Sequence, residues 1–230
     1  MAIMSIDIVF EHVDWLLCYK PAGMDFHDDQ GTPGFISHLK QQTKIVDLFP
    51  VHRLDKPTSG LILVAKTLDA CQALNDLFSA RNIEKYYLAL CPNSLKKKQG
   101  MIKGDMEKSR RGTFKLLKSN TNPAVTQFFS HSLEAGIRLC ILKPRTGKTH
   151  QLRVAMKSLS APILGDQSYS GKVEDRLYLH AYALRFEYGG EHFEFMVPPK
   201  EGNLFDAESF QHWLQTSGEP WDLNWPKSSN

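Results

Sequence analysis

The stretch Val51–Lys66 reads VHRLDKPTSGLILVAK, and the rest of the chain is best understood from it. Leu61–Ala65 is a continuous apolar run, which is typical of a strand buried on both faces. Pro57 and Gly60 mark a tight turn just before this strand. Asp55 is therefore predicted to lie in a loop at the end of a core strand. Such a carboxylate is either catalytic or bonded to its own turn, and spacing alone leaves both interpretations open.

The composition is that of an ordinary globular chain. It has 230 residues, of which 42% are hydrophobic and 23% are charged, enough for one sizeable core. We expect a single domain over residues 1–216 and a mobile tail over residues 217–230. The four cysteines are widely spaced without a C-x-x-C pair, so we expect them to be reduced and structural in a cytoplasmic protein. No apolar run approaches membrane-spanning length, and the N-terminus lacks the basic start of a signal peptide.

Charge is distributed unevenly along the chain, although the net charge is only +3. Lys96–Lys118 holds nine Lys or Arg residues and two acidic residues, a local charge of +7. Glu187–Asn230 holds eight acidic residues and two lysines, a local charge of −6. A polyanion such as RNA would approach the first region and avoid the second. The alternative for Lys96–Lys118 is a solvated charged hairpin.

Strand signals outnumber helix signals. Strands are expected at Ile6–Phe10, Trp15–Tyr19, Leu61–Ala65, Glu84–Cys91, Thr113–Lys118, Ala124–His131, Gly136–Lys143, Leu177–Tyr188 and His192–Val197. Helices are expected at Pro33–Thr43, from an N-cap at Thr67 to Arg81, after a cap at Thr149, and at Asp206–Gln215. Pro92–Gly112 reads as a polar, basic segment. Because short turns join most of the strands, this order predicts an α+β fold with a mixed, mostly antiparallel sheet.

Three stretches, in order, resemble the RluA-type pseudouridine synthases, which isomerise uridine in RNA. They are WLLCYKPAGM (Trp15–Met24), HRLDKPTSG (His52–Gly60), and KPRTGKTHQLRV (Lys143–Val154), the last followed by PILGDQSY (Pro162–Tyr169). The similarity extends from Phe10 to Pro199. Three long motifs in one order are far more specific than any short pattern. The resemblance implies a central sheet crossed by an active-site cleft, with helices and loops around it.

The resemblance implies a catalytic set of Asp55, Tyr87 and Arg153. Asp55 would attack as a nucleophile or stabilise positive charge on the ribose, as carboxylates do in glycoside hydrolysis. Arg153 would pair with this carboxylate, the alternative being a solvated helix residue. Tyr87, two residues after Lys85, would stack on the uracil; the alternative is a core tyrosine. Tyr86 is adjacent and points to the opposite face of the strand.

The resemblance also implies residues that contact RNA. Arg53 would fill the gap left when the target uridine is flipped out of its stack. Leu152 would line the uracil pocket, or else be a plain core leucine. His52 would support the loop, while Lys56 and Lys148 would contact phosphates. For these last three residues, ordinary structural or solvated roles are equal alternatives.

These observations predict a stand-alone RNA pseudouridine synthase that acts on structured tRNA or rRNA. Isomerisation involves no net oxidation, so no cofactor and no metal are expected, and we expect a monomer away from membranes. The alternative is a catalytically inactive RNA-binding protein of the same fold, against which the intact Asp55, Tyr87 and Arg153 argue. A nucleoside hydrolase would need a second carboxylate; Asp166 is the motif-embedded candidate, and it reads better as a turn residue.

Two departures from the family pattern concern the target RNA more than the chemistry. Ala155 stands where relatives usually carry His, and Ser160-Ala161 stands where they carry Gly-His. The small N-terminal RNA-binding domain of some relatives is not present in this sequence. We therefore expect the catalytic domain itself to recognise the target.

Overall fold

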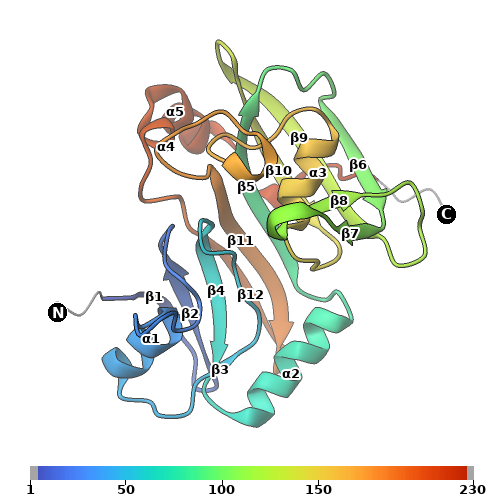
Figure 1. The fold of residues 1–230 in the computed structure, drawn as a ribbon. Helices are drawn as coiled ribbons and strands as arrows, with labels where there is room; N and C mark the ends of the chain where they lie inside the picture. The colour runs from blue at the N-terminus through green and yellow to red at the C-terminus, as the bar shows by residue number, and fades with distance from the viewer. Residues whose placement is uncertain (1–4, 227–230) are drawn as a thin grey trace. The chain divides into compact units, whose positions relative to one another are not determined.

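The computed structural model describes residues 5–226 (Figure 1). The chain folds as two compact units, and each is described by itself. The first unit takes the chain up to Ile83 together with Ala181–Val197, and the second takes Glu84–His180 and the chain from Pro198 onward. The first unit is therefore built from two separate stretches of sequence. The single domain expected from the sequence stays a prediction.

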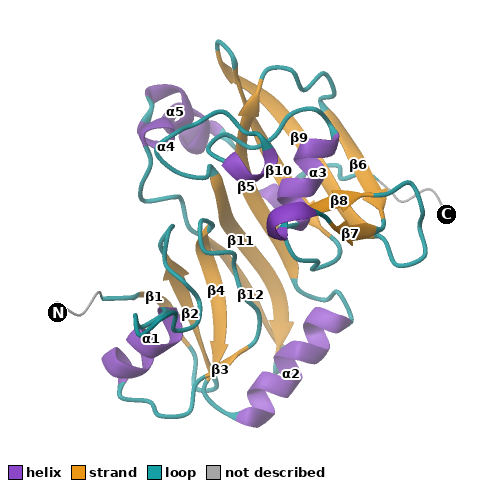
Figure 2. Ribbon diagram, viewed as in Figure 1, coloured by secondary structure: helices purple, strands orange, loops and turns teal. Residues whose placement is uncertain are grey.

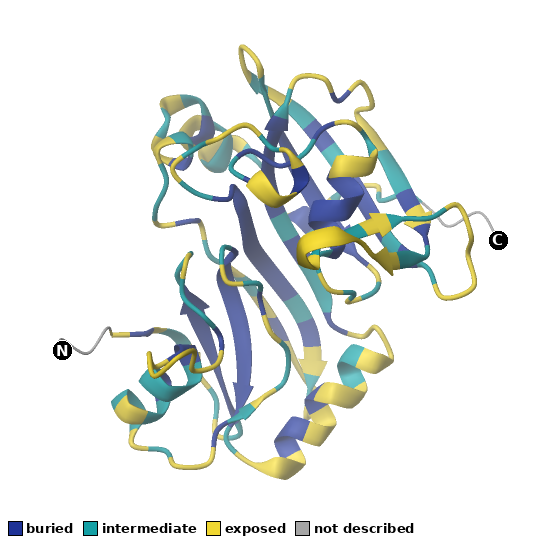
Figure 3. Ribbon diagram, viewed as in Figure 1, coloured by how far each residue is buried: buried dark blue, intermediate teal, exposed yellow. Residues whose placement is uncertain are grey.

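The first unit contains a sheet whose central strands are buried along their whole length. Its strands are β1 (Asp7–Glu11), β2 (Trp15–Lys20), β3 (Phe49–Pro50), β4 (Ser59–Ala65), β11 (Leu179–Tyr188) and β12 (Glu191–Met196). The strand order is β1-β2-β4-β11, with β12 paired to β11 and β3 paired to β4. All residues of β2 and β4 are buried (Figure 3). The apolar run of the signature stretch is thus the core strand that the sequence predicts.

Two helices flank this sheet, α1 (Phe35–Thr43) and α2 (Leu68–Ser79). The predicted N-cap of α2 is confirmed, because the Thr67 hydroxyl oxygen accepts the backbone N–H of Ala70 at 3.1 Å. The apolar side of α2 packs against the sheet. The core there is formed by Trp15, Leu17, Leu61, Leu63, Ala65, Ala70, Cys71, Leu74, Ile83, Leu184, Phe186 and Phe193.

The second unit contains an antiparallel sheet and a separate hairpin. The sheet strands are β5 (Glu84–Pro92), β6 (Gln99–Gly104), β9 (Ala124–Glu134) and β10 (Ile137–Pro144). Their order is β5-β10-β9-β6, and each neighbouring pair is antiparallel. The hairpin pairs β7 (Met106–Lys108) with β8 (Phe114–Leu116) across the 3-10 turn η1 (Arg110–Gly112).

The segment Pro92–Gly112, read from the sequence as merely polar and basic, contains strands β6 and β7. Its lysines and glycines have low strand propensity, so local pattern does not reveal them. The glycines nevertheless fit close approaches within the unit. A Cβ atom at Gly100 would lie 3.0 Å from the ring of Phe128, and one at Gly104 would lie 2.2 Å from the carbonyl oxygen of Leu117. Long-range packing therefore decides the conformation of this segment.

The helical elements of the second unit are short. They are α3 (Gln151–Ser158), η2 (Gln167–Tyr169), α4 (Asn203–Asp206), α5 (Glu208–Thr216) and η3 (Pro220–Asp222). Two sequence predictions need correction. Thr149 does not cap α3, since the N-cap is His150, which has φ of 57° and makes no side-chain cap bond. The helix expected over Asp206–Gln215 begins two residues later, as α5, because Ala207 is extended with ψ of 142° and separates it from the short α4.

The chain after α5 packs on the sheet of the second unit. Trp221 and Trp225 contact the ring of Tyr86, with centroids 6.1 and 5.7 Å away, and Trp225 also contacts Phe129 at 5.1 Å. Mobility of residues 217–230 stays a prediction, and the last four of these residues lie outside the described part of the chain.

Both units combine strands with flanking helices (Figure 2), so the predicted α+β class with a mixed, mostly antiparallel sheet is confirmed. All four cysteines are free and buried, as expected. Within residues 5–226, every helix is too short or too polar to cross a bilayer.

Candidate active site

Asp55 lies in the turn that leads into β4, as the sequence predicts. Its backbone carbonyl accepts the N–H of Thr58 at 3.0 Å, and its side chain is half-buried. Leu54, the residue before it, is buried. Gly60 has φ of +118°, and a Cβ atom there would lie 2.3 Å from the carbonyl oxygen of Ala181 in β11. The loop therefore leads into a buried strand whose glycine lies close against the backbone of β11.

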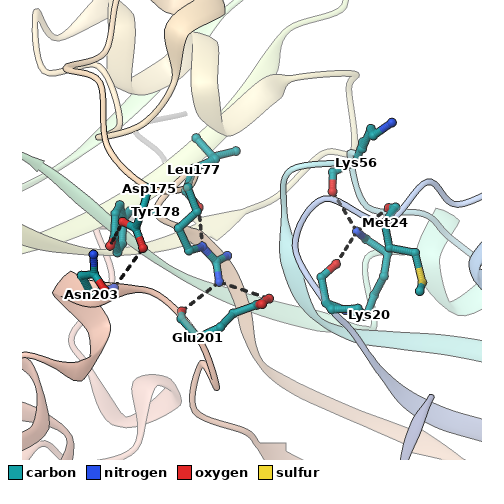
Figure 4. Close-up of polar contacts among 10 residues, drawn as sticks. Lys20, Met24, Lys56, Asp175, Leu177, Tyr178, Glu201 and Asn203 are labelled. Carbon is teal, nitrogen blue, oxygen red and sulfur yellow. Dashed lines mark hydrogen bonds and ion pairs between the residues drawn. The ribbon is translucent and has the colours of Figure 1, made fainter. Parts of the chain in front are cut away.

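A buried lysine holds this loop. The side chain of Lys20, at the end of β2, is fully buried. Its Nζ donates to the carbonyl oxygens of Pro21 and Met24 at 2.9 Å each, and of Lys56 at 3.0 Å (Figure 4). The carbonyl of Lys56 also accepts the N–H of Gly23 at 2.9 Å. One cation thus ties the first sequence motif to the residue that follows Asp55. Sequence reasoning missed this role, for which the available signal was a lysine that ends an apolar strand.

The neighbours of Asp55 have separate contacts within the first unit. His52 Nε2 accepts the N–H of Leu63 at 2.9 Å, so this nitrogen carries no proton and the imidazole supports the loop. Lys56 Nζ lies 2.6 Å from a carboxylate oxygen of Asp25, a bond that raises the pKa of Lys56. Arg53 is exposed. Contacts of these three residues with RNA stay predictions.

In the second unit, strand β5 presents two tyrosines to opposite faces. Tyr86 is fully buried; its hydroxyl donates to a carboxylate oxygen of Glu84 at 2.7 Å and accepts from Lys143 Nζ at 3.1 Å. Lys143 also pairs with Glu84 at 2.5 Å. Tyr87 is half-buried and lies opposite Leu142 in the ladder with β10. Tyr86 is therefore committed to the core, which leaves Tyr87 as the candidate for chemistry.

Lys85 shares the face of Tyr87, because residues two apart on a strand point the same way. Burial lowers the pKa of Lys85. A Cβ atom at Gly147 would lie 4.0 Å from Lys85 Nζ, so this amine reaches the turn of the third sequence motif. Sequence reasoning used Lys85 only to place Tyr87. The feature of the sequence that could have drawn attention to Lys85 is a single cation in a strand rich in aromatic residues.

Arg153 is buried in α3 with a relative exposure of 5%, so the alternative of a solvated helix residue is wrong. Its Nε and Nη2 atoms each donate to a different carboxylate oxygen of Asp166 at 2.8 Å. The guanidinium carbon lies 4.9 Å from the ring centroid of Tyr169. Asp166 is itself in a turn, with its backbone carbonyl accepting the N–H of Gly171 at 2.8 Å. The predicted pairing of Arg153 with Asp55 stays a prediction; the partnership with Asp166 was missed.

The turn between β10 and α3 is held by a buried amide. The side-chain oxygen of Gln151 accepts the N–H of Lys148 at 3.0 Å and the hydroxyl of Thr146 at 2.7 Å. Its nitrogen donates to the carbonyl of Val125 and the hydroxyl of Thr126, both at 3.0 Å. The side chain of Gln151 thus bonds the turn of the third motif through its oxygen and strand β9 through its nitrogen.

Two other predicted residues lie in this part of the second unit. Leu152 is buried at the start of α3. Lys148 is half-buried, and its Nζ donates to the side-chain oxygen of Asn122 at 2.9 Å. Their contacts with uracil and phosphate stay predictions.

The basic segment occupies β6, the β7–β8 hairpin and the loops beside them. At the tip of the hairpin, Arg110 and Arg111 are exposed. Lys115 pairs with Glu107 across the hairpin at 2.9 Å, so part of the positive charge is neutralised locally. The two arginines are left as the prominent cations at the tip.

The described residues contain no group of three or more His, Cys, Asp or Glu side chains arranged to hold a metal ion.

A model of the RNA pseudouridylate synthase family matches residues 14–158, more than half of the chain. This span includes all three residues of the predicted catalytic set.

Known relatives are similar over most of their length. An uncharacterized RNA pseudouridine synthase of Haemophilus influenzae is 45% identical over 204 residues, which cover 88% of this chain and 91% of the relative. Ribosomal large subunit pseudouridine synthase D of Vibrio vulnificus is 31% identical over 246 residues, covering 94% and 74%. The solved structure of human RNA Pseudouridylate Synthase Domain Containing 1 gives a TM-score of 0.73 at 27% identity, covering 86% and 85%. The chain therefore belongs to the RNA pseudouridylate synthase family, which confirms the enzyme class that its three motifs predict.

Proposed function

We propose that the protein isomerises specific uridines to pseudouridine in structured RNA, with Asp55 as the catalytic carboxylate. The observation that carries this proposal is the clamp on the loop of Asp55, in which the buried Lys20 binds three backbone carbonyls. A catalytic group must be held within a fraction of an ångström while staying accessible to substrate. The half-buried side chain of Asp55 on a rigidly held backbone meets both requirements.

The reaction breaks the bond between uracil N1 and the ribose C1′. The uracil then rotates and rejoins C1′ through its C5 atom; the C5 proton is lost to solvent, and N1, released from the sugar, takes up a proton. Asp55 either attacks as a nucleophile or stabilises the positive charge that develops on the sugar. Atoms balance without an oxidant or reductant, because the product is an isomer of the substrate.

Two residues of the second unit complete the proposed set. Arg153 would pair with Asp55 and favour its ionised form, while Asp166 fixes the orientation of the guanidinium from its own unit. Tyr87 would stack on the uracil close to the proton that leaves C5. The burial of Tyr86 in the Glu84–Lys143 cluster supports the choice of Tyr87.

The target uridine must leave its stack, which costs roughly a few kcal/mol. Arg53, exposed beside Asp55, would occupy the gap in the RNA. Leu152 would line the uracil pocket, and His52 would keep the loop in shape. Lys56 and Lys148 would contact phosphates, and the basic segment Lys96–Lys118 would bind the RNA backbone more distantly.

The substrate class we propose is tRNA or rRNA, and the relatives favour rRNA. The Vibrio vulnificus relative is named as a synthase of the large ribosomal subunit, and a Haemophilus ducreyi relative is named likewise. A cytoplasmic location follows from such a substrate. We propose a monomer that works without metal or cofactor.

Two other functions are less well supported. An inactive RNA-binding protein would have no need of a clamped and accessible Asp55. A nucleoside hydrolase would need a second carboxylate for acid–base work. Asp166 is 2% exposed with both carboxylate oxygens bound to Arg153, so it does not supply that group.

Asp55→Asn provides the direct test. Because the amide can neither attack nor carry the negative charge, tritium release from RNA labelled at uracil C5 should fall at least about a thousandfold. RNA affinity should stay within a few-fold of wild type. In cells lacking the gene, a site-resolved pseudouridine map of total RNA should lose one or a few sites, restored by wild type and not by Asp55→Asn.

Asp47→Asn serves as the matched control, because Asp47 is an exposed carboxylate of the same unit. This variant should release tritium at the wild-type rate. Full activity of Asp55→Asn would remove the central assignment, and tight RNA binding without turnover by wild type would favour the inactive RNA-binding protein.

A further inference from the structure

Tyr169 makes two different kinds of contact in the second unit, through its ring and through its hydroxyl. The residue is 5% exposed and lies in η2, three residues after Asp166. Its ring lies beneath the guanidinium of Arg153, 4.9 Å from the guanidinium carbon to the ring centroid. Arg153 is thus held by the carboxylate of Asp166 at one edge and by an aromatic face.

The hydroxyl of Tyr169 reaches the basic hairpin. It accepts the backbone N–H of Phe114, the first residue of β8, at 2.9 Å. It also lies 2.8 Å from Nδ1 of His150, the residue before α3. The His150 ring packs edge-on against Phe114, with centroids 5.6 Å apart. One oxygen atom therefore joins the hairpin to the start of the helix that carries Arg153.

The hairpin has a second attachment at its base. The carboxylate of Asp105 accepts the N–H groups of Thr121 and Asn122 at 2.9 and 2.8 Å, and its backbone carbonyl accepts the N–H of Leu117 at 2.8 Å. Strands β7 and β8 form a two-stranded sheet of their own. Such a ribbon is marginal without support, so the bond from Tyr169 near its tip has a large influence on where the tip lies.

We propose that Tyr169 is a positioning residue that links two parts of the site. Through its hydroxyl it places the basic hairpin for binding RNA phosphates, and through its ring it orients Arg153. This inference rests on the proposed function. Arg110 and Arg111 at the tip bind the RNA backbone, and the Tyr169 hydroxyl sets the position of that tip. The ring of the same side chain holds Arg153 in its orientation, so RNA binding and the catalytic guanidinium share one support.

Tyr169→Phe separates the two contacts, because it removes the hydroxyl and keeps the ring under Arg153. The Michaelis constant for RNA in tritium release should rise roughly three- to tenfold, the effect of losing one or two hydrogen bonds. The turnover number should stay within about twofold of wild type. RNA affinity measured by fluorescence anisotropy should fall by the same factor as the Michaelis constant rises.

Coupling is tested by adding Arg110→Ala and Arg111→Ala. These two changes alone should raise the Michaelis constant by removing phosphate contacts. If the hydroxyl acts through the hairpin tip, Tyr169→Phe should then have almost no further effect in their presence. A fully additive effect would overturn the proposal, as would a loss of turnover with an unchanged Michaelis constant.

Tyr188→Phe is the matched control, since the Tyr188 hydroxyl donates to a carboxylate oxygen of Asp14 at 3.2 Å in the first unit. It should leave the Michaelis constant and RNA affinity unchanged. RNA affinity, measured by fluorescence anisotropy for these variants, tests the inference independently of whether the enzyme turns over. Absence of tritium release by wild type would therefore count against the proposed function, while an unchanged RNA affinity of Tyr169→Phe would count against this inference.

Discussion

One loop carries Asp55 and another leads into the helix that carries Arg153, and the two loops are held in different ways. The loop of Asp55 in the first unit is bound by the charged Lys20, which donates to three backbone carbonyls. The turn before α3 in the second unit is bound by the neutral Gln151, which uses both its oxygen and its nitrogen. Each loop depends on one buried polar side chain from an adjoining element.

The difference lies in what happens when the side chain is lost. Lys20 is a donor only, so its three partners are all acceptors, and hydrogen bonds to a charged group are the stronger kind. Gln151 satisfies donors and acceptors together through bonds that are individually weaker. The loop that carries the proposed catalytic carboxylate therefore has the stronger and less replaceable support.

Lys20→Met should break the first loop and have the largest effect. Methionine keeps the length of the side chain but removes all three hydrogen bonds from Nζ, so that the carbonyl of Lys56 keeps only the N–H of Gly23. We expect the free energy of unfolding to fall by about 2–4 kcal/mol, measured by urea denaturation. Tritium release should fall at least tenfold even where the variant is folded, because Asp55 loses its fixed position.

The control for this change is Lys44→Met, which removes an exposed lysine from the same unit. Its stability and activity should match wild type. If Lys20→Met retained wild-type activity, the clamp would have no part in positioning Asp55.

Gln151→Leu should loosen the second loop by a smaller amount. The substitution keeps the bulk of the side chain and removes its four hydrogen bonds. We expect a fall of about 1–3 kcal/mol in the free energy of unfolding, again by urea denaturation. Gln215→Leu, an exposed change in α5 of the same unit, should leave stability nearly unaltered. A larger loss for Gln151→Leu than for Lys20→Met would reverse the comparison.

Lys56→Ala and Lys148→Ala should have the smallest effects, one on each loop. Each lysine is a predicted phosphate contact, and each is bonded to an acceptor, Asp25 or Asn122. Each change should reduce the slope of log affinity against log salt concentration by about one. Binding titrations over a range of salt concentrations measure this slope, and Lys44→Ala is the control. An unchanged slope would mean that the residue only supports its loop.

The sequence predicted those elements whose signal is local. Leu61–Ala65 is apolar throughout, and β4 is buried on both faces. Thr67 has the chemistry of an N-cap, and its hydroxyl accepts the N–H of Ala70. Each of these features depends on residues close together in the chain, and the structure has each of them.

Features set by distant partners were missed. Strand β6 contains two glycines and a lysine, and it exists because β9 pairs with it. The bond of Lys20 Nζ to the carbonyl of Lys56 and that of Arg153 to the carboxylate of Asp166 form only in the tertiary fold. The motifs identified Asp55, Tyr87 and Arg153 as candidates, but a motif does not state which buried group holds each one in place.

The discontinuous make-up of the first unit has a consequence for its synthesis. Strand β4 pairs with β11, whose part in this unit begins at Ala181, after the stretch Glu84–His180 of the second unit has been translated. At roughly 5–20 residues per second, the wait is on the order of ten seconds. During this time the apolar edge of β4 has no β11 to cover it, and such an edge is prone to pair with other chains. The sheet of the first unit is thus completed late in translation, although most of its strands are made before the second unit begins.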